Sequence, residues 1–510
     1  MKGFGVLRRL IAIATLLSCA ADAATLGKAA VVVATAEQAC AARSAAELEA
    51  CQARLRDGGV VRISLASRIQ CRNGSRPCLD LRERVAPLWL TGAPGAAGLY
   101  RANYSQPLLS ISGTQRLVIQ DVTFEDALWP SCFPRLAPPG PWQPMIKIEG
   151  AAMVVFKNCT FLRGFNIGVS VSTSSNIVFS HNTWLESQRF GVWADPDAMG
   201  QYSRHVHFFG NQFLHGRNNA FIGTLSDSSF QGNDFVHNHH IACFNQSGGQ
   251  LDIIQTPGPN SNLTIAANRV VNGSITGGDS GQDWHKLSTY AFEINSGIHV
   301  FLLHNDAYNH SGWSIFPNRN NWPGGANVTL EANRMCSRCL CGPLFPSLCV
   351  PNATHTVCVG RVHPSTQGHA PNWCNETDEP WVHRRARQCE ANSNKRGVCG
   401  DADCGAPVRP RGELRANTDR GGQASVSWSV TDVDPRSVRV LRNFSLSGIP
   451  VPVAVSDSLR GKSGNGSEAL PDVPSIASGG ELVALWAEGY GVLDVTVVAL
   501  IGAPPTPQNP

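Results

Sequence analysis

Apolar and polar residues alternate in a series of short segments between residues 117 and 335. Each segment leads to a fixed position two residues before another apolar residue, as in 117–124 (LVIQDVTF) and 207–213 (HFFGNQF). That position holds Val122, Cys159 and then Asn six times: Asn182, Asn211, Asn233, Asn268, Asn305 and Asn333. Successive positions lie 22 to 37 residues apart. The alternation predicts strands, and a repeat of this length with insertions is typical of β-helix coils.

A second series of strands alternates with the first. Its members are 108–112, 145–150, 168–172, 191–195, 220–224, 241–244 (IACF), 291–295 and 313–317. Two series of equal number predict about eight or more coils of an all-β fold. Residues 45–56 predict a helix that caps the open end of the stack, before first strands at GGVVRISL and LWLTG.

The repeated Asn is interpreted as structural. At a sharp turn Asn tolerates left-handed backbone angles. Its amide can donate to the identical amide one rung away, at about 4.8 Å. A ladder of this kind satisfies buried polar groups, so we do not expect these six residues to bind a ligand.

The N-terminus has the three parts of a signal peptide. A basic region with Lys2, Arg8 and Arg9 precedes a short apolar stretch at 10–20 and a small-x-small site at 21–23. We therefore expect cleavage after residue 23, secretion and no membrane span. The net charge is +4, and loss of the leader with its three basic residues and one acid would leave +2. A charge so close to zero argues against nucleic acid as a partner.

Cysteine usage agrees with export. Of 17 cysteines, Cys40 and Cys51, and Cys71 and Cys78, are spaced as local disulfide pairs, and nine lie between residues 336 and 404. This crowding predicts a disulfide-rich segment at 341–404. Its irregular spacing disfavours zinc or redox chemistry at the CxxC of 336–339. Twelve N-x-S/T sequons are potential glycan acceptors.

The composition changes after residue 404. Residues 405–504 lack the Asn turns and contain strand-like runs: ASVSWSV, SVRVLRNFSL, PVPVAVS, ELVALWA and GVLDVTVVAL. They predict a small β-sandwich, which could serve in adhesion, carbohydrate binding or assembly with partners. Residues 505–510 read as a disordered tail, and 24–340 as the β-helix with its cap.

With its Asn turns, entry helix and LTG strand at 90–92, the chain resembles the pectate-lyase-like superfamily of right-handed parallel β-helix proteins over roughly residues 37–340. The resemblance implies that fold. It leaves function open, because the superfamily includes lyases, glycoside hydrolases, epimerases and non-catalytic surface or virion proteins. The paired acidic motifs of polygalacturonases are missing.

The resemblance places a ligand groove on the outer face of the second strand series. Long insertions at 125–144 and 271–290 would wall it. Four residues just before strands of this series, on consecutive rungs, predict a basic edge beside an exposed Trp: Arg163, Arg189, Arg217 and His239. Such an edge would suit an acidic polysaccharide, because Arg binds carboxylates and Trp stacks on sugars. Candidate catalytic residues are Arg189, Asp195, Arg217, His239 and Glu149. Candidate substrate-binding residues are Trp193, Lys147, Arg163 and Glu293.

Three mechanisms can be compared on this face. Glu149 and Asp195, two rungs or about 9.6 Å apart, would be at the outer limit of an inverting hydrolase pair. Calcium-assisted elimination needs clustered carboxylates, but Ser172 and Thr224 flank Asp195, so the cluster is missing unless Asp197, Asp279 or Asp283 supplies it. No cofactor is therefore expected, and Ca²⁺ is possible but unsupported. Metal-free elimination needs a base and a cation, which Lys147 or the Arg and His candidates could supply.

Two functional hypotheses follow. The first is a secreted scaffold at a surface, matrix or particle that binds acidic polysaccharide without assured catalysis. The alternative is a polysaccharide lyase, epimerase or hydrolase acting on uronate-containing glycans. The disulfide-rich segment and β-rich tail favour the first, and the two long loops favour the second.

Overall fold

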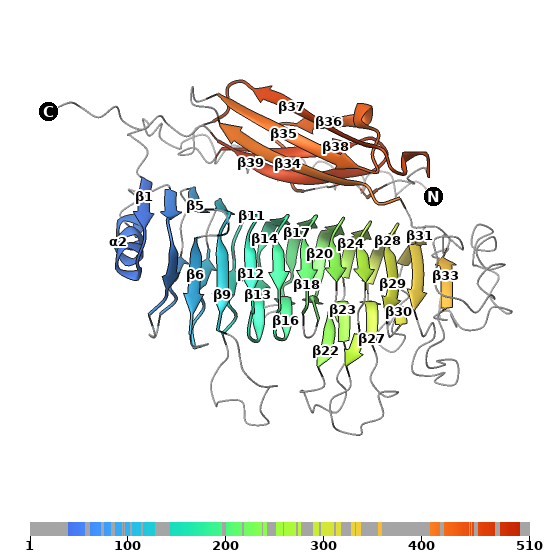
Figure 1. The fold of residues 1–510 in the computed structure, drawn as a ribbon, viewed down its shortest axis with the longest axis horizontal. Coiled ribbons are helices and arrows are strands. Elements are labelled where there is room, and N and C mark those ends of the chain that lie inside the picture. Colours follow the sequence, from blue (N-terminus) through green and yellow to red (C-terminus); the bar gives the residue numbers. More distant parts are fainter. Residues whose placement is uncertain are drawn as a thin grey trace, which may run out of the picture. The chain divides into compact units, whose positions relative to one another are not determined.

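The computed structural model describes residues 39–499 with gaps, the longest of which are 128–142, 242–250, 277–288, 318–327, 338–354 and 360–407. Three long sheets wind around a common core, and successive coils each add one strand to every sheet (Figure 1). The chain is a right-handed parallel β-helix followed by a small antiparallel β domain, so the predicted fold class is confirmed.

Sheet A contains the first predicted strand series and runs the length of the stack. Its outer face is largely buried, in contrast to the outer face of sheet C. Its strands are β1 (Ala39–Ala42), β2 (Arg62–Leu65), β5 (Leu88–Gly92), β8 (Leu117–Gln120), β11 (Val154–Lys157), β14 (Ser175–Ser180), β17 (Ser203–Phe209), β20 (Leu225–Gln231), β24 (Asn260–Ala266), β28 (Gly297–Leu303) and β31 (Val328–Glu331).

Sheet B consists of the short strands that follow the Asn position in each coil. All its pairings are parallel except the last, where β33 runs antiparallel to β32. Its strands are β3 (Arg68–Gln70), β6 (Gly98–Arg101), β9 (Thr123–Asp126), β12 (Thr160–Leu162), β15 (Thr183–Leu185), β18 (Gln212–Leu214), β21 (Asp234–Val236), β25 (Arg269–Val271), β29 (Asp306–His310), β32 (Asn333–Ser337) and β33 (His355–Val359).

Sheet C contains the second predicted series. Its strands are β4 (Leu79–Arg82), β7 (Leu109–Ser112), β10 (Ile146–Glu149), β13 (Ile167–Ser172), β16 (Phe190–Asp195), β19 (Phe221–Gly223), β23 (Leu251–Thr256), β27 (Thr289–Ile294) and β30 (Trp313–Pro317).

One member of this series was predicted wrongly. The strand between β19 and β27 is β23, in which Ile254 pairs with Phe221 and Phe292, and not 241–244. Residues at the start of that segment belong instead to β22 (His239–Ile241), which pairs with β26 (Ser274–Thr276) in a separate two-stranded sheet. Both segments have suitable apolar residues, and only the register with the neighbouring coils distinguishes them.

Aromatic side chains form two columns inside the stack. Phe156, Phe179, Phe208 and Phe230 stack on successive coils, with ring centroids 5.1, 4.9 and 4.4 Å apart. Behind sheet B, Phe161, Trp184, Phe213 and Phe235 stack at 4.5, 4.5 and 4.8 Å. Identical inward positions in register therefore give a core of stacked rings, each contact adding to the burial energy.

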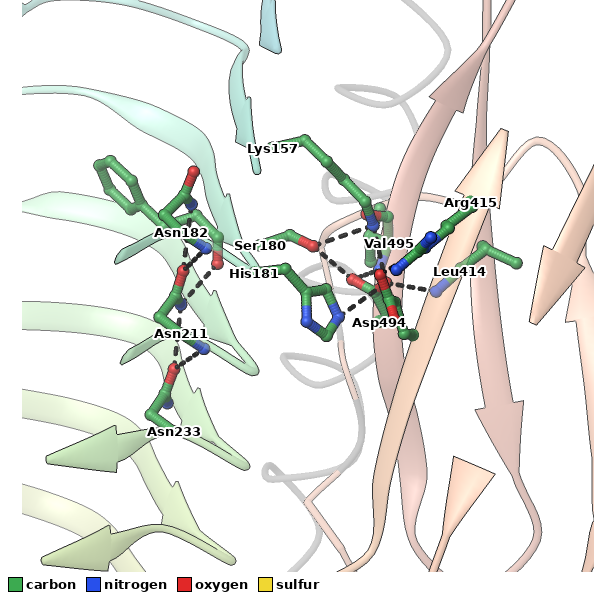
Figure 2. A network of polar contacts seen from close by, with 12 residues as sticks. Lys157, Ser180, His181, Asn182, Asn211, Asn233, Leu414, Arg415, Asp494 and Val495 are labelled. Atoms are coloured by element: carbon green, nitrogen blue, oxygen red, sulfur yellow. Dashed lines mark hydrogen bonds and ion pairs between the residues drawn. The ribbon is translucent and has the colours of Figure 1, made fainter. Parts of the chain in front are cut away.

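The Asn side chains form a hydrogen-bonded ladder at the turn between sheets A and B. The Nδ2 of Asn182 donates to Oδ1 of Asn211 (3.0 Å), and the same bond joins Asn211 to Asn233 (2.9 Å), as Figure 2 shows. The ladder continues through Asn268 to Asn305. The side chain of Asn333 is outside the described part.

The left-handed backbone angle lies one residue before the Asn and not on the Asn, which corrects the expectation. The preceding residues have φ of 52° at His181, 60° at Gly210 and 67° at Gly232. The side-chain oxygen of the Asn accepts a hydrogen bond from the backbone N–H of the equivalent residue one coil earlier, as Asn182 Oδ1 does from Cys159 (2.8 Å). Asn therefore suits this position because its side chain both accepts and donates hydrogen bonds, and not because of its own backbone angles.

The predicted cap is α2 (Ala45–Arg56), at the end of the stack beside β1 (Figure 1). Ser44 Oγ caps the helix by accepting from the backbone N–H of Glu47 (3.2 Å), and the Glu47 carboxylate accepts from the backbone N–H of Arg43 (2.6 Å), one residue before the cap. One helix face, with Leu48 and Leu55, is buried. The predicted disulfides Cys40–Cys51 and Cys71–Cys78 are both present.

The C-terminal domain is a sandwich of two three-stranded antiparallel sheets. Four of its strands, β35, β36, β38 and β39, lie where apolar alternation predicted them. The strands β34 and β37 are polar in sequence and were missed because they flank β35 as outer strands. The sheets are β34 (Arg411–Thr418), β35 (Ala424–Thr431) and β37 (Ser463–Leu470), and β36 (Val438–Leu441), β38 (Glu481–Ala487) and β39 (Gly491–Val498), with 3-10 turns η5 (Pro435–Ser437) and η6 (Asp457–Leu459). For 450–456 no strand is described.

The sandwich packs on the outer face of sheet A. Val155, Val178 and Phe209 of the β-helix form one buried cluster with Val492 and Val495 of β39. An apolar outer face is otherwise unusual for a soluble β-helix, and here the sandwich covers it.

A charged network lies inside this interface (Figure 2). Lys157 Nζ is 2.7 Å from Asp494 Oδ2, and Ser180 Oγ donates to Oδ1 of the same carboxylate (2.6 Å). The backbone N–H of Leu414 and the ring of His181 also contact Asp494. Burial acts to raise the pKa of Asp494, but Lys157 and His181 outweigh it and hold the pKa well below its usual range. The carboxylate is therefore ionised.

Candidate ligand surface on sheet C

The outer face of sheet C carries two rows of aligned side chains. In one row Lys147 pairs with Ser170 and Ser170 with Trp193, and the row continues through Ile222 and Gln255. In the other, Glu149 pairs with Ser172, which pairs with Asp195. Parallel strands place neighbours in a row about 4.8 Å apart. This face is the surface on which the site was predicted.

The charged residues near its start neutralise one another. Lys147 Nζ lies 2.7 Å from Glu149 Oε2, and on β4 Arg82 Nε lies 2.8 Å from Asp80. Both residues of the Lys147–Glu149 pair are well exposed, so the pair contributes little to stability. It does fix Glu149 against a cation.

A cation and two aromatic rings form a cluster on β16. The guanidinium of Arg189 lies over the Phe190 ring, 4.6 Å from its centroid, and Phe190 meets Trp193 edge to face at 4.8 Å. Arg189 Nη1 donates to Oδ1 of Asn166 (3.0 Å). Partial burial lowers the pKa of Arg189, yet Arg stays charged at neutral pH. Trp193 remains half-buried.

Of the predicted basic edge, the two arginines whose side chains the structure describes, Arg163 and Arg189, do not occupy equivalent positions. Arg163 follows β12 directly and has a left-handed φ of 59°, a turn position that Glu186 and His215 occupy on the next coils. Its guanidinium binds Glu125, which also pairs with Arg68. Arg189 instead immediately precedes β16. The two arginines lie at opposite ends of the turn between sheets B and C, a difference that spacing along the sequence did not reveal.

The remaining candidates are only partly placed. His239 belongs to β22 and not to sheet C, as expected from the misplaced strand. Glu293 pairs with Gln255 and so continues the Trp193 row. The side chains of His239 and Glu293, and Arg217 altogether, lie outside the described residues.

The two exposed acids are placed as expected. Ser172 separates Glu149 from Asp195, so they are two rungs apart. Thr224, expected on the outer face beyond Asp195, is buried instead, because Gly258 after β23 packs on its hydroxyl. Within the described ranges, no group of three or more His, Cys, Asp or Glu is arranged to hold a metal ion.

A buried ion pair that was not anticipated anchors the long insertion at 125–144. Arg101 is bound by both oxygens of Asp126, and its Nη atoms donate to the carbonyls of Pro144 and Gln143, each at 3.2 Å. Asp126 also accepts from the backbone N–H of Phe165 (2.9 Å). Both stems of the insertion are thereby fixed beside sheet C. An acid directly after an apolar strand end was the only signal in the sequence.

Comparisons with known proteins give only distant matches. No family model and no curated protein matches the sequence. Similar solved structures include PfbA, a surface adhesin of Streptococcus pneumoniae (10% identity, 57% of this chain, 85% of that chain, TM-score 0.34). Others are an alginate lyase from Paenibacillus sp. str. FPU-7 (12%, 58%, 94%, 0.26) and the pectate lyase pelN from Paenibacillus sp. 0602 (11%, 59%, 78%, 0.33).

Similarity at this level does not bear on activity. The chain's own three parallel sheets define its class by fold, a parallel β-helix. Across the described segments, no helix is both long enough and apolar enough to span a bilayer.

Proposed function

We propose that this protein is a secreted β-helix scaffold that binds acidic polysaccharide on the outer face of sheet C. The observation that carries the proposal is the Arg189–Phe190–Trp193 cluster, in which the Phe190 ring contacts both the Arg189 guanidinium and the indole ring of Trp193 at the start of β16. An indole face stacks on a sugar ring, and a guanidinium pairs with a uronate carboxylate.

Two features support a scaffold role. Buried contacts at Lys157 and Asp494 join the sandwich to the β-helix, so both parts would move as one body. The two disulfides at the capped end are typical of proteins from oxidising compartments, which supports secretion together with the leader-like N-terminus.

The acids on this face favour binding over hydrolysis. Glu149 is paired with Lys147, whereas the general acid of a hydrolase lies in an apolar or anionic environment. Its separation from Asp195 by two rungs, about 9.6 Å, is at the limit for an inverting pair. Binding of a polymer by a cation and an aromatic ring does not require two carboxylates at a catalytic separation.

Binding can be measured by calorimetry with polygalacturonate and alginate, and with neutral dextran as the comparison polymer. Trp193→Ala and Arg189→Gln should each weaken binding of the acidic polymers about tenfold, because each removes about 1–2 kcal/mol of contact. Arg439→Gln is the matched control, since Arg439 lies over Trp486 on the sandwich at 5.9 Å. Equal binding by all variants, or release of unsaturated products from the polymers by the wild type, would overturn the proposal.

A further inference from the structure

Three arginines converge on a single carboxylate oxygen where the sandwich meets the β-helix. Arg269 of β25 and Arg409 just before β34 bind Oδ1 of Asp234 at 2.9 and 3.1 Å, and Arg411 Nη2 binds the same atom. Arg409 also donates to the backbone carbonyl of Ala267 (2.9 Å). The cluster thus joins two coils of the β-helix to the first strand of the sandwich.

The positive charge of this cluster exceeds its negative charge. At another ion pair across this interface, one lysine, Lys157, faces one acid, Asp494. Here the side chain of Arg409 is only 11% exposed and that of Asp234 only 9%. Buried charges are stable only when they are compensated, and one carboxylate cannot compensate three guanidiniums.

Two further acids lie near the cluster. Asp306 is the register neighbour of Arg269 on the next coil. Asp432 accepts from the backbone N–H groups of Arg409 (3.3 Å) and Gly461 (2.6 Å). Burial, and next the charge of Arg411, lower the pKa of Arg409 to about 10, as expected for a cation with too little counter-charge.

The cluster also contains hydrogen-bond donors without acceptors. Among the described residues, Arg411 Nε and the Tyr490 hydroxyl are buried and have no partner. Burial raises the pKa of Tyr490, and the charges of Arg409 and Arg411 act against that rise, so the phenol lies within their field. The side chains of Arg269 and Arg411 are 37% and 32% exposed, which leaves the cluster open to solvent on one side.

We propose that Arg269, Arg409 and Arg411 form a binding site for a doubly charged tetrahedral oxyanion, phosphate or sulfate. Two negative charges balance the two cations that Asp234 leaves uncompensated. Guanidinium forks match the oxygens of such anions, and Arg411 Nε and the Tyr490 hydroxyl are the additional donors. The anion would bridge the β-helix and the sandwich, at a place separate from the polysaccharide face of sheet C.

Calorimetry on the full-length protein tests the site directly. Inorganic sulfate and phosphate are titrated in chloride at constant ionic strength, against wild type, Arg411→Gln and Arg436→Gln. Arg436 is the control because it is an exposed arginine paired with Asp434 on the same domain. The wild type and the control should each bind one ion. The affinity of Arg411→Gln should be at least about tenfold weaker, because this variant loses a charge-assisted contact. Absence of binding, or equal binding by Arg411→Gln, overturns the proposal.

The melting temperature in chloride alone gives a second measurement that does not depend on the ligand. Arg411→Gln removes one contact to Asp234, which Arg269 and Arg409 still compensate, and it also removes the repulsion between Arg411 and Arg409. Its melting temperature should therefore equal or exceed that of wild type. A clear decrease would mean that Asp234 suffices for all three arginines, and would contradict the proposal.

Dextran sulfate separates the two sources of the anion. Tighter binding than inorganic sulfate, lost in Arg411→Gln and retained in Arg189→Gln, would identify a sulfate ester on a polymer. Equal or weaker binding would identify a free ion.

Discussion

Lys157 and Asp494 lie 337 residues apart in the sequence, yet their side chains form a buried ion pair at 2.7 Å. Each stands in an otherwise apolar strand, Lys157 at the end of β11 and Asp494 within β39. The pair gives the interface between β-helix and sandwich a polar contact that apolar packing alone would not specify. Ser180 bonds to both groups and closes the network.

Removal of one partner of the Lys157–Asp494 pair should destabilise the protein, because the other charge stays buried. Lys157→Met leaves Asp494 as an uncompensated buried carboxylate and should lower the free energy of unfolding by about 3–5 kcal/mol in denaturant titrations. Lys157→Met/Asp494→Asn should recover much of that loss, because Asn is neutral and still accepts from Leu414 N–H. Lys462→Met, at an exposed and longer pair with Asp434 (3.6 Å), should change stability little. A double variant as unstable as the single one would contradict this account.

A buried histidine predicts acid sensitivity of the same interface. Burial lowers the pKa of His207 to about 3, with a smaller effect of His205, while its Nδ1 bonds to Ser229 Oγ (3.0 Å). The unfolded chain takes up a proton below about pH 6.5 and the folded chain does not, so stability is present above that pH and is lost as pH falls toward 3. At about pH 5 the loss should be about 2 kcal/mol.

The comparison of His207→Gln with wild type from pH 7 to pH 4 isolates this contribution. The difference in unfolding free energy between the two proteins should shift in favour of the variant as pH falls. His215→Gln, at an exposed position, controls for a change of His to Gln. Parallel stability curves for wild type and His207→Gln would show that His207 is protonated in the folded protein.

The Asn ladder should be sensitive at its centre. Asn233→Leu removes the acceptor of both the N–H and the Nδ2 of Asn211, and the donor to Asn268. Each buried group left unpaired costs about 1–3 kcal/mol, so the unfolding free energy should fall by several kcal/mol. Gln212→Leu is the control, because Gln212 is exposed and directly follows Asn211 of the ladder. Similar denaturation midpoints for the two variants would show that water replaces the ladder.

The sequence was sufficient for features that repeat. Alternation and the Asn positions located sheets A and C and the cap, and local spacing located both disulfides. Non-local choices were not visible: β23 displaced 241–244 because its register fits β19 and β27, and the Lys157–Asp494 pair depends on a docking that neither strand encodes alone. At the candidate site, the rows containing Trp193 and Asp195 followed from alternation, whereas the position of Arg163 depended on turn geometry.

The first rung of the ladder offers a substitution that should be tolerated. Cys159 occupies the position before Asn182, is buried without a disulfide, and its Sγ lies 3.5 Å from the carbonyl of Ile119. In the next rung the equivalent carbonyl, that of Phe156, accepts from Asn182 Nδ2 (3.0 Å). Cys159→Asn should therefore extend the ladder by one rung and keep or increase stability.

Two further measurements define that prediction. Cys159→Leu, which has no donor, should be less stable than Cys159→Asn in denaturant titrations. In the wild type, burial raises the pKa of Cys159 to about 12, so alkylation at neutral pH should modify this residue only after unfolding, as peptide mass spectrometry would report. If Cys159→Asn were the less stable variant, the turn at this coil would differ in structure from the Asn-containing turns. The ladder would then begin at Asn182 because the turn before it does not accommodate Asn.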